Sequence, residues 1–167
     1  MKTKLIALLS VGIVPCFAGC VSNPIALAPV GPDLISRAVP GTDGYLKVFT
    51  ATQTVDVDFE AYFNPHLGYE IDDQAGKCVK YVANHASAMD ETPDTVSLPP
   101  GNYKIVAEST WCGLVTMPVA IQRGQTTTIH LDGRWWHPSH SANAGQLVYL
   151  PNGEAVGWSS LASNSSP

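Results

Sequence analysis

Charged residues are few in this sequence, and basic residues are the scarcest of them. Lysine and arginine number 9 against 14 aspartates and glutamates, which gives a formal net charge of −5 over 167 residues. A protein that binds nucleic acid neutralises phosphates with clustered basic side chains. Here the lysines and arginines are scattered along the chain, so no nucleic-acid partner is expected.

The chain also lacks the short motifs of common enzymes. It contains no glycine-rich phosphate loop, no G-x-S-x-G elbow, no H-E-x-x-H pair and no S-x-x-K sequence. Each of these motifs places a nucleophile, a base or a phosphate in a defined local geometry. We therefore expect a non-catalytic protein that needs no cofactor.

The N-terminus lacks an apolar run long enough for a membrane-spanning helix, which needs roughly 20 residues. Lys2 and Lys4 are followed by the uncharged stretch Leu5 to Gly19, which has 15 residues and is interrupted by Pro15. A short basic head followed by such a run is typical of a signal peptide. We expect residues 1–19 to be that signal, and the protein to be exported.

The uncharged stretch leads into Phe17-Ala18-Gly19-Cys20. This sequence resembles the bacterial lipobox, in which small residues precede an obligatory cysteine, although Phe17 stands where leucine is usual. The resemblance implies that Cys20 is lipidated and becomes the mature N-terminus. The absence of aspartate at position 21 favours the outer membrane. Ordinary cleavage after Ala18 or Gly19 is the alternative, and it would leave a secreted or periplasmic protein.

The expected mature chain would reach a membrane only through that lipid. Removing Lys2 and Lys4 with the signal leaves 7 basic and 14 acidic residues, a net charge of −7. An anionic lipid surface repels such a domain. Two or more acyl chains anchor a protein stably, where one chain is marginal. The predicted partners are therefore the membrane, through a covalent anchor, and an envelope protein or glycan.

Cysteine is rare, with four residues in all. Cys16 lies in the expected signal and Cys20 is the expected lipid site, which leaves Cys78 and Cys112. An even number in an oxidising compartment is typical of a disulfide. We predict a Cys78–Cys112 bond, worth about 3–4 kcal/mol in the chain-entropy model. A metal or redox pair is the alternative, which the absence of C-x-x-C spacing disfavours.

The mature chain divides into a proline-rich start and a long region of alternating residues. Four prolines exclude a regular helix from residues 20–44, which we interpret as a tether. Period-two alternation predicts short strands over residues 45–52, 55–63, 69–71, 78–82, 96–98, 103–107, 115–121 and 127–131. About seven such strands predict an all-β fold, a small Greek-key β-sandwich over residues 45–133. Pro118 cannot donate to a ladder, so its strand is expected to be an edge strand or to be bulged.

Two motifs within residues 96–131 resemble a known family. Leu98–Ala107 reads LPPGNYKIVA, and Val119–Thr127 reads VAIQRGQTT. Both are similar to carboxypeptidase-regulatory-like and transthyretin-like domains, whose pattern is LPPGxYxVxA followed by xVxIxxGxTT. The resemblance implies the same small β-sandwich and no catalysis by this module.

Residues 134–167 are expected to add a Trp/His segment, a terminal hairpin and a frayed tail. Leu147–Leu150 and Ala155–Trp158 flank an Asn-Gly pair, which predicts a hairpin. His130, which alternates with buried positions in the preceding strand, is expected on the surface.

Two pairs of residues in this last region are candidates for binding. Trp135 and Trp136 could stack on sugar rings and form a glycan or small-ligand site. The alternative is that the rings pack against the sandwich, because each buries a large area. His137 and His140 could seed a zinc or copper site of a metal-dependent hydrolase, with solvated histidines as the alternative. The main prediction remains a non-catalytic, lipid-anchored cell-envelope protein with a structural or protein-interaction role.

Overall fold

The computed structural model describes residues 28–34, 38–57, 61–135 and 144–161. Those residues form eleven strands and one short 3-10 turn, η1, so the all-β prediction is confirmed and the predicted number of strands was too low. No helix in this part of the chain is long and apolar enough to cross a membrane. The elements are β1 (Gly44–Phe49), β2 (Val55–Val57), β3 (Ala61–Phe63), β4 (Tyr69–Asp72), β5 (Cys78–Val82), β6 (Thr95–Leu98), β7 (Gly101–Ser109), β8 (Gly113–Ile121), β9 (Thr126–His130), η1 (Ala144–Gln146), β10 (Leu147–Tyr149) and β11 (Ala155–Trp158).

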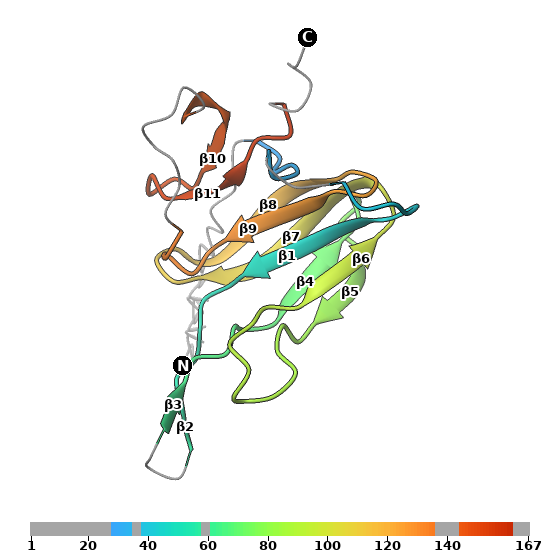
Figure 1. Cartoon of the computed structure of the whole chain (residues 1–167). Helices are drawn as coiled ribbons and strands as arrows, with labels where there is room; N and C mark the ends of the chain where they lie inside the picture. Colours follow the sequence, from blue (N-terminus) through green and yellow to red (C-terminus); the bar gives the residue numbers. More distant parts are fainter. Residues whose placement is uncertain (1–27, 35–37, 58–60, 136–143, 162–167) are drawn as a thin grey trace, which may run out of the picture.

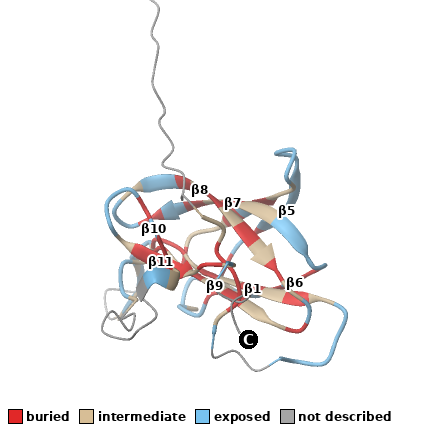
Figure 2. Cartoon of the chain, turned by 90° about the horizontal axis from the view of Figure 1, so that it is seen from above, coloured by how far each residue is buried: buried red, intermediate tan, exposed pale blue. Residues whose placement is uncertain are grey.

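Two sheets pack face to face over one core (Figures 1 and 2). One sheet has the strand order β5-β4-β7-β8 and the other the order β6-β1-β9, in which β1 and β9 run parallel. Along β1, β8 and β9 every second side chain is buried, which is the alternation that the sequence shows. The largest fully buried side chains are Tyr69, Leu46, Ile71, Ile105, Met117, Ile129, Leu131, Val30, Val48, Val115, Val119 and Val156.

The predicted strand over residues 55–63 is instead a hairpin. β2 and β3 pair antiparallel, with Val55 opposite Phe63 and Asp56 opposite Tyr62. Figure 1 shows this hairpin projecting from one end of the two sheets. Alternation could not reveal the break, because residues paired across a hairpin face the same side and the period of two continues through the turn.

The predicted disulfide is not present, and both cysteines are free thiols. Cys78 begins β5 and pairs with Asp72 of β4. Asp72 in turn pairs with Lys104 of β7, so Cys78 and Lys104 lie at the same height in the sheet, two strands apart. Cys112 lies in the turn after β7, beyond five further strand residues. Strand rise and spacing then place the two cysteines about 20 Å apart, whereas a disulfide needs Cα atoms within about 7 Å. Counting cysteines could not reveal that the topology separates them.

Part of the predicted tether belongs to the folded domain. Val30 is fully buried, and it forms bridges with Val119 in β8 and with Ser159, the residue after β11. Its N–H donates to the carbonyl of Pro118 at 3.0 Å, and its carbonyl accepts from the N–H of Ala120 at 2.8 Å. Asp33 then donates its N–H to Thr126 in β9. Residues 30–33 therefore cross from the edge of one sheet to the edge of the other.

Pro118 lies at the edge that its chemistry predicts. The carbonyl of Pro118 points towards Val30, away from β7. The nitrogen and the carbonyl of one strand residue point to the same side, so the missing N–H of Pro118 costs no bond to β7.

The terminal hairpin joins the core. β10 and β11 pair antiparallel, and Gly153 adopts φ +86° in the bend between them, as the Asn-Gly pair predicts. Val148, Leu150 and Val156 are buried in the same cluster as the residues of the two sheets. The hairpin therefore covers part of the core and belongs to the folded domain.

Candidate functional site

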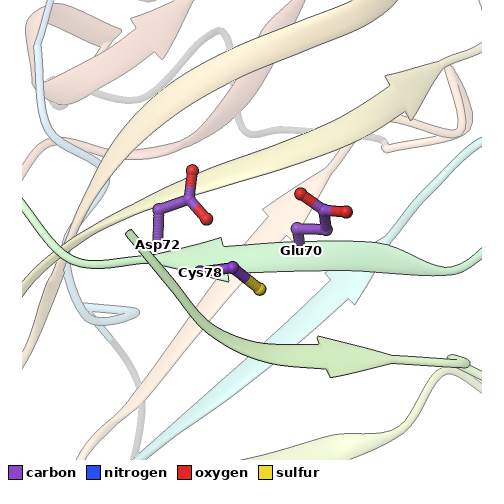
Figure 3. A group of neighbouring side chains, drawn as sticks. All are labelled: Glu70, Asp72 and Cys78. Atoms are coloured by element: carbon purple, nitrogen blue, oxygen red, sulfur yellow. The ribbon is translucent and has the colours of Figure 1, made fainter. Parts of the chain in front are cut away.

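Three side chains with metal-ligating atoms gather on the outer face of the β4–β5 hairpin. The carboxylates of Glu70 and Asp72 and the thiol of Cys78 have ligand atoms within 4.8 Å of one another. Glu70 and Asp72 are two residues apart on β4, so they share a face, and Figure 3 shows the Cys78 sulfur beside them. A register shift between Ile71 and Asp72 sets Cys78 directly opposite Asp72. This bulge is what completes the cluster.

The chemistry of these donors suits a divalent cation such as zinc, which accepts both thiolate and carboxylate ligands. No fourth histidine, cysteine, aspartate or glutamate joins them among the described residues. Glu70 and Cys78 are exposed, and Asp72 is half-buried. A structural zinc site has four protein ligands and is closed. The three described ligands alone would leave the coordination open to a further ligand.

An aromatic stack of three rings, with a fourth ring edge-on at its end, lies on the outer face of the smaller sheet. The ring of Phe49 on β1 lies parallel to His130 on β9, with centroids 4.7 Å apart. His130 is stacked in turn on Trp135 at 4.6 Å, and Trp135 meets Trp158 edge-on at 6.2 Å. Strand pairing places Phe49 directly opposite His130. The stack therefore fastens the terminal hairpin and the segment after β9 to the sheet.

The place of His130 in this stack lowers its pKa to about 4. Burial between the two rings disfavours the charged imidazolium most, and the ammonium group of Lys47 adds to this effect. The carboxylate of Asp132 acts in the opposite direction. His130 does point outward with Thr126 and Thr128, as predicted, but it is not a bare surface residue, because Trp135 from the segment after β9 covers its ring. His130 is consequently neutral at pH 7.

Trp111 is the most exposed large apolar side chain of the described residues, at 71%. It lies in the β7–β8 turn, where the Ser109 hydroxyl accepts from the backbone N–H groups of Trp111 and Cys112. A Cβ atom built on Gly133 would come within 2.2 Å of the indole Nε1, so only glycine lets the ring rest there. The indole is thus positioned by its edge while its faces remain largely open to solvent.

The same end of the molecule holds two groups with raised pKa values. Burial raises the pKa of the Cys112 thiol, and the carboxylate of Glu154 adds to that shift. Burial also raises the pKa of Glu154, although the Asn152 side chain donates a hydrogen bond to it. A protonated thiol is a poor nucleophile and a poor metal ligand, so the surroundings of Cys112 disfavour its reactive thiolate form.

A buried polar network lies where β1 ends, close to the end of β7, because Ala51 donates its N–H to the carbonyl of Glu108. The Asn84 side chain is fully buried and donates to the carbonyls of Val48 and Leu67 and to the Thr50 hydroxyl. Asn84 adopts φ +69°, a left-handed conformation that asparagine tolerates better than most residues. The hydroxyl of Tyr69 is also buried, but no hydrogen-bond partner for it is described. Burial raises the pKa of Tyr69, and the Asp94 carboxylate contributes further.

The binding residues predicted from sequence fare differently. Trp135 lies in the aromatic stack, which favours the packing alternative for this ring. Trp136, His137, His140 and Cys20 lie outside the described residues. Sequence analysis missed the Glu70, Asp72 and Cys78 cluster. Carboxylates two residues apart, in a hairpin whose other arm begins with cysteine, were the available signal.

Comparisons of the chain with protein-family models, with curated proteins and with solved structures found no match. The resemblance carried by Leu98–Ala107 and Val119–Thr127 therefore stays a prediction.

Proposed function

We propose that this chain is an exported lipoprotein whose all-β domain has a non-catalytic, structural or protein-binding role at the cell envelope. The observation that carries the proposal is the sequence Phe17-Ala18-Gly19-Cys20 at the end of an uncharged, signal-like stretch. Outer-membrane anchoring follows from the absence of aspartate after Cys20. The lipid supplies the membrane contact that a domain with a net charge of −7 would not make by itself.

The proposal extends to the fold type that the two motifs imply, a Greek-key sandwich of the transthyretin-like class. What supports this likeness is the position of the motifs relative to the sheets. Leu98 ends β6 in one sheet, and Gly101 begins β7 in the other, so LPPG makes the crossing between sheets. The second motif spans the end of β8 and the start of β9, and again changes sheet.

The large apolar side chains left on the surface support a role in protein contact. Tyr62 on the projecting β3 is 67% exposed, and Tyr81 on the edge strand β5 is 64% exposed. Exposed aromatic side chains are enriched where proteins bind one another. Edge strands such as β5 also present unpaired backbone groups to a partner.

Mass spectrometry of the N-terminal peptide from the native host membrane tests the anchor. We expect a peptide that begins at Cys20 and carries acyl chains, and a C20S variant that is released into the soluble fraction. An unmodified N-terminus on a soluble protein would overturn the proposal. Non-catalytic character is tested separately, by incubating the purified protein with envelope polymers and looking for products.

A second candidate function is glycan binding, favoured by one specific observation. The exposed indole of Trp111 offers a flat apolar face, which is the geometry that stacks on sugar rings. The platform would thus be Trp111 in place of Trp135, whose ring is already stacked on His130.

Calorimetric titration with soluble peptidoglycan fragments tests this second function. We expect a W111A variant to lose binding while its thermal stability stays close to that of the wild type, because the ring is exposed. Y62A removes an equally exposed aromatic side chain from another part of the surface and is the matched control. Equal binding by both variants, or no binding by the wild type, would exclude Trp111 as the platform.

A further inference from the structure

The docking of Val30 fixes the point at which the N-terminal arm leaves the folded domain. Backbone hydrogen bonds hold this residue from two directions. Val30 bonds Pro118 and Ala120 of β8, and the neighbouring Gly31 donates its N–H to the carbonyl of Trp158 at 2.7 Å. The side chain of Val30 is fully buried. The described part of the arm, from Ala28 on, is therefore docked on the domain.

This docking makes the arm short. Ala28 follows Cys20 by eight residues, which span at most about 29 Å when fully extended. If the whole stretch from Cys20 to Gly44 were free, its 24 residue steps would span up to about 86 Å. The length of the arm therefore decides how far the domain can move away from the bilayer.

We infer that the domain is held against the membrane, with the surface around residues 28–31 and 159–161 facing the lipid. This inference rests on the proposed lipidation of Cys20. Ser160 donates its N–H to the carbonyl of Pro29, so the last described residues lie beside the arm. The neighbouring Leu161 is 69% exposed. Neither stretch contains lysine or arginine, so the short arm holds the domain at the bilayer without electrostatic attraction.

The opposite end of the molecule would then face away from the membrane. Figure 1 shows the β2–β3 hairpin at the far end of the sheets from residues 28–34 and β11. Tyr62 lies on this hairpin and is exposed. A partner that approaches from the aqueous side would meet the hairpin first.

Energy transfer to the bilayer tests this orientation in the full-length, lipidated protein. The protein is reconstituted in phosphatidylcholine vesicles that carry an acceptor dye on the headgroups. A donor dye is attached to L161C or to Y62C, each in a background in which Cys78 and Cys112 are serine. We expect strong transfer from position 161 and weak transfer from position 62.

An insertion of about 16 Gly and Ser residues after Val21 lengthens the arm as a flexible coil. A coil of 24 residues has a root-mean-square length of about 27 Å against about 16 Å for eight residues, so we expect the insertion to lower the transfer from position 161 measurably. Unchanged transfer after insertion would overturn the short arm as the cause, and equal transfer from positions 161 and 62 would overturn the orientation. Mass spectrometry of the same preparation separates these outcomes from failure of the proposed function, because an N-terminus without lipid would overturn both.

Discussion

Replacing Val30 with alanine tests whether the N-terminal arm is part of the stable fold. The substitution removes two methyl groups from a fully buried side chain, which costs about 1.6 kcal/mol at about 0.8 kcal/mol per buried methylene. Hydrogen bonds on both sides hold the backbone, so the site cannot collapse around the smaller residue and a cavity cost is added. We expect a total loss of about 2–3 kcal/mol in the free energy of unfolding.

Urea unfolding followed by tryptophan fluorescence measures this loss in a chain that begins at Val21. V39A is the matched control, because Val39 undergoes the same change while 48% exposed, and we expect its cost to stay within about 0.5 kcal/mol. Equal costs for V30A and V39A would refute the view that the arm is packed into the core.

A double-mutant cycle makes the same test without relying on one magnitude. A Cβ atom on Gly157 would come within 2.6 Å of Cγ1 of Val30. We expect G157A to destabilise the protein by about 1–3 kcal/mol through overpacking. Truncating Val30 removes that clash, so the double variant should be more stable than the sum of the two costs by more than about 0.5 kcal/mol. Additive costs would show that the two residues do not meet.

Three further predictions concern ionisable and polar groups. Unfolded His130 binds its proton near pH 6.5 and the folded form only near pH 4, so stability should fall as the pH drops through that window. The loss is at most about 3 kcal/mol and smaller after solvent screening; urea melts of H130F should lack it, whereas identical pH profiles would contradict the stacking argument. Y69F should leave stability unchanged or raise it, because the lost hydroxyl has no described partner. N84A in the same melts should lower the free energy of unfolding by about 1–3 kcal/mol or more. Mass spectrometry after alkylation should show exposed Cys78 reacting before Cys112. Zn²⁺ should slow the alkylation of Cys78 only, and E70Q should remove that protection. Equal protection in E70Q would show that the three donors do not act together.

Local alternation was enough to predict most of the strands. The hairpin of β4 and β5, with Gly76 at φ +82° in its bend, follows the apolar positions and the glycine that the sequence displays. The terminal hairpin follows its Asn-Gly pair in the same way. Burial on alternate positions is a property of one strand and its face, so a single segment carries the signal.

Pairing between distant segments was not predictable, because it depends on the backbone of both partners. Val30 lies in a proline-rich stretch with no alternation, and its bonds to β8 come from main-chain groups that every sequence possesses. Cys78 and Cys112 satisfied the cysteine rule, but the register of three strands separates them. The candidate cluster at Glu70 depends on a bulge that moves Cys78 opposite Asp72. No residue pattern in the sequence predicts that bulge.

The convergence of the N-terminal arm and the terminal hairpin on β8 and β9 changes what counts as the folding unit. Residues 45–133, the domain predicted from sequence, would leave the edge of β8 without Val30 and the core without Val148 and Val156. Bare edge strands beside exposed apolar surface promote association between chains. We therefore expect residues 45–133 to aggregate when produced alone, while residues 28–161 stay monomeric in size-exclusion chromatography with light scattering. A monomeric 45–133 fragment that melts cooperatively would show that the two sheets fold without the two flanking segments.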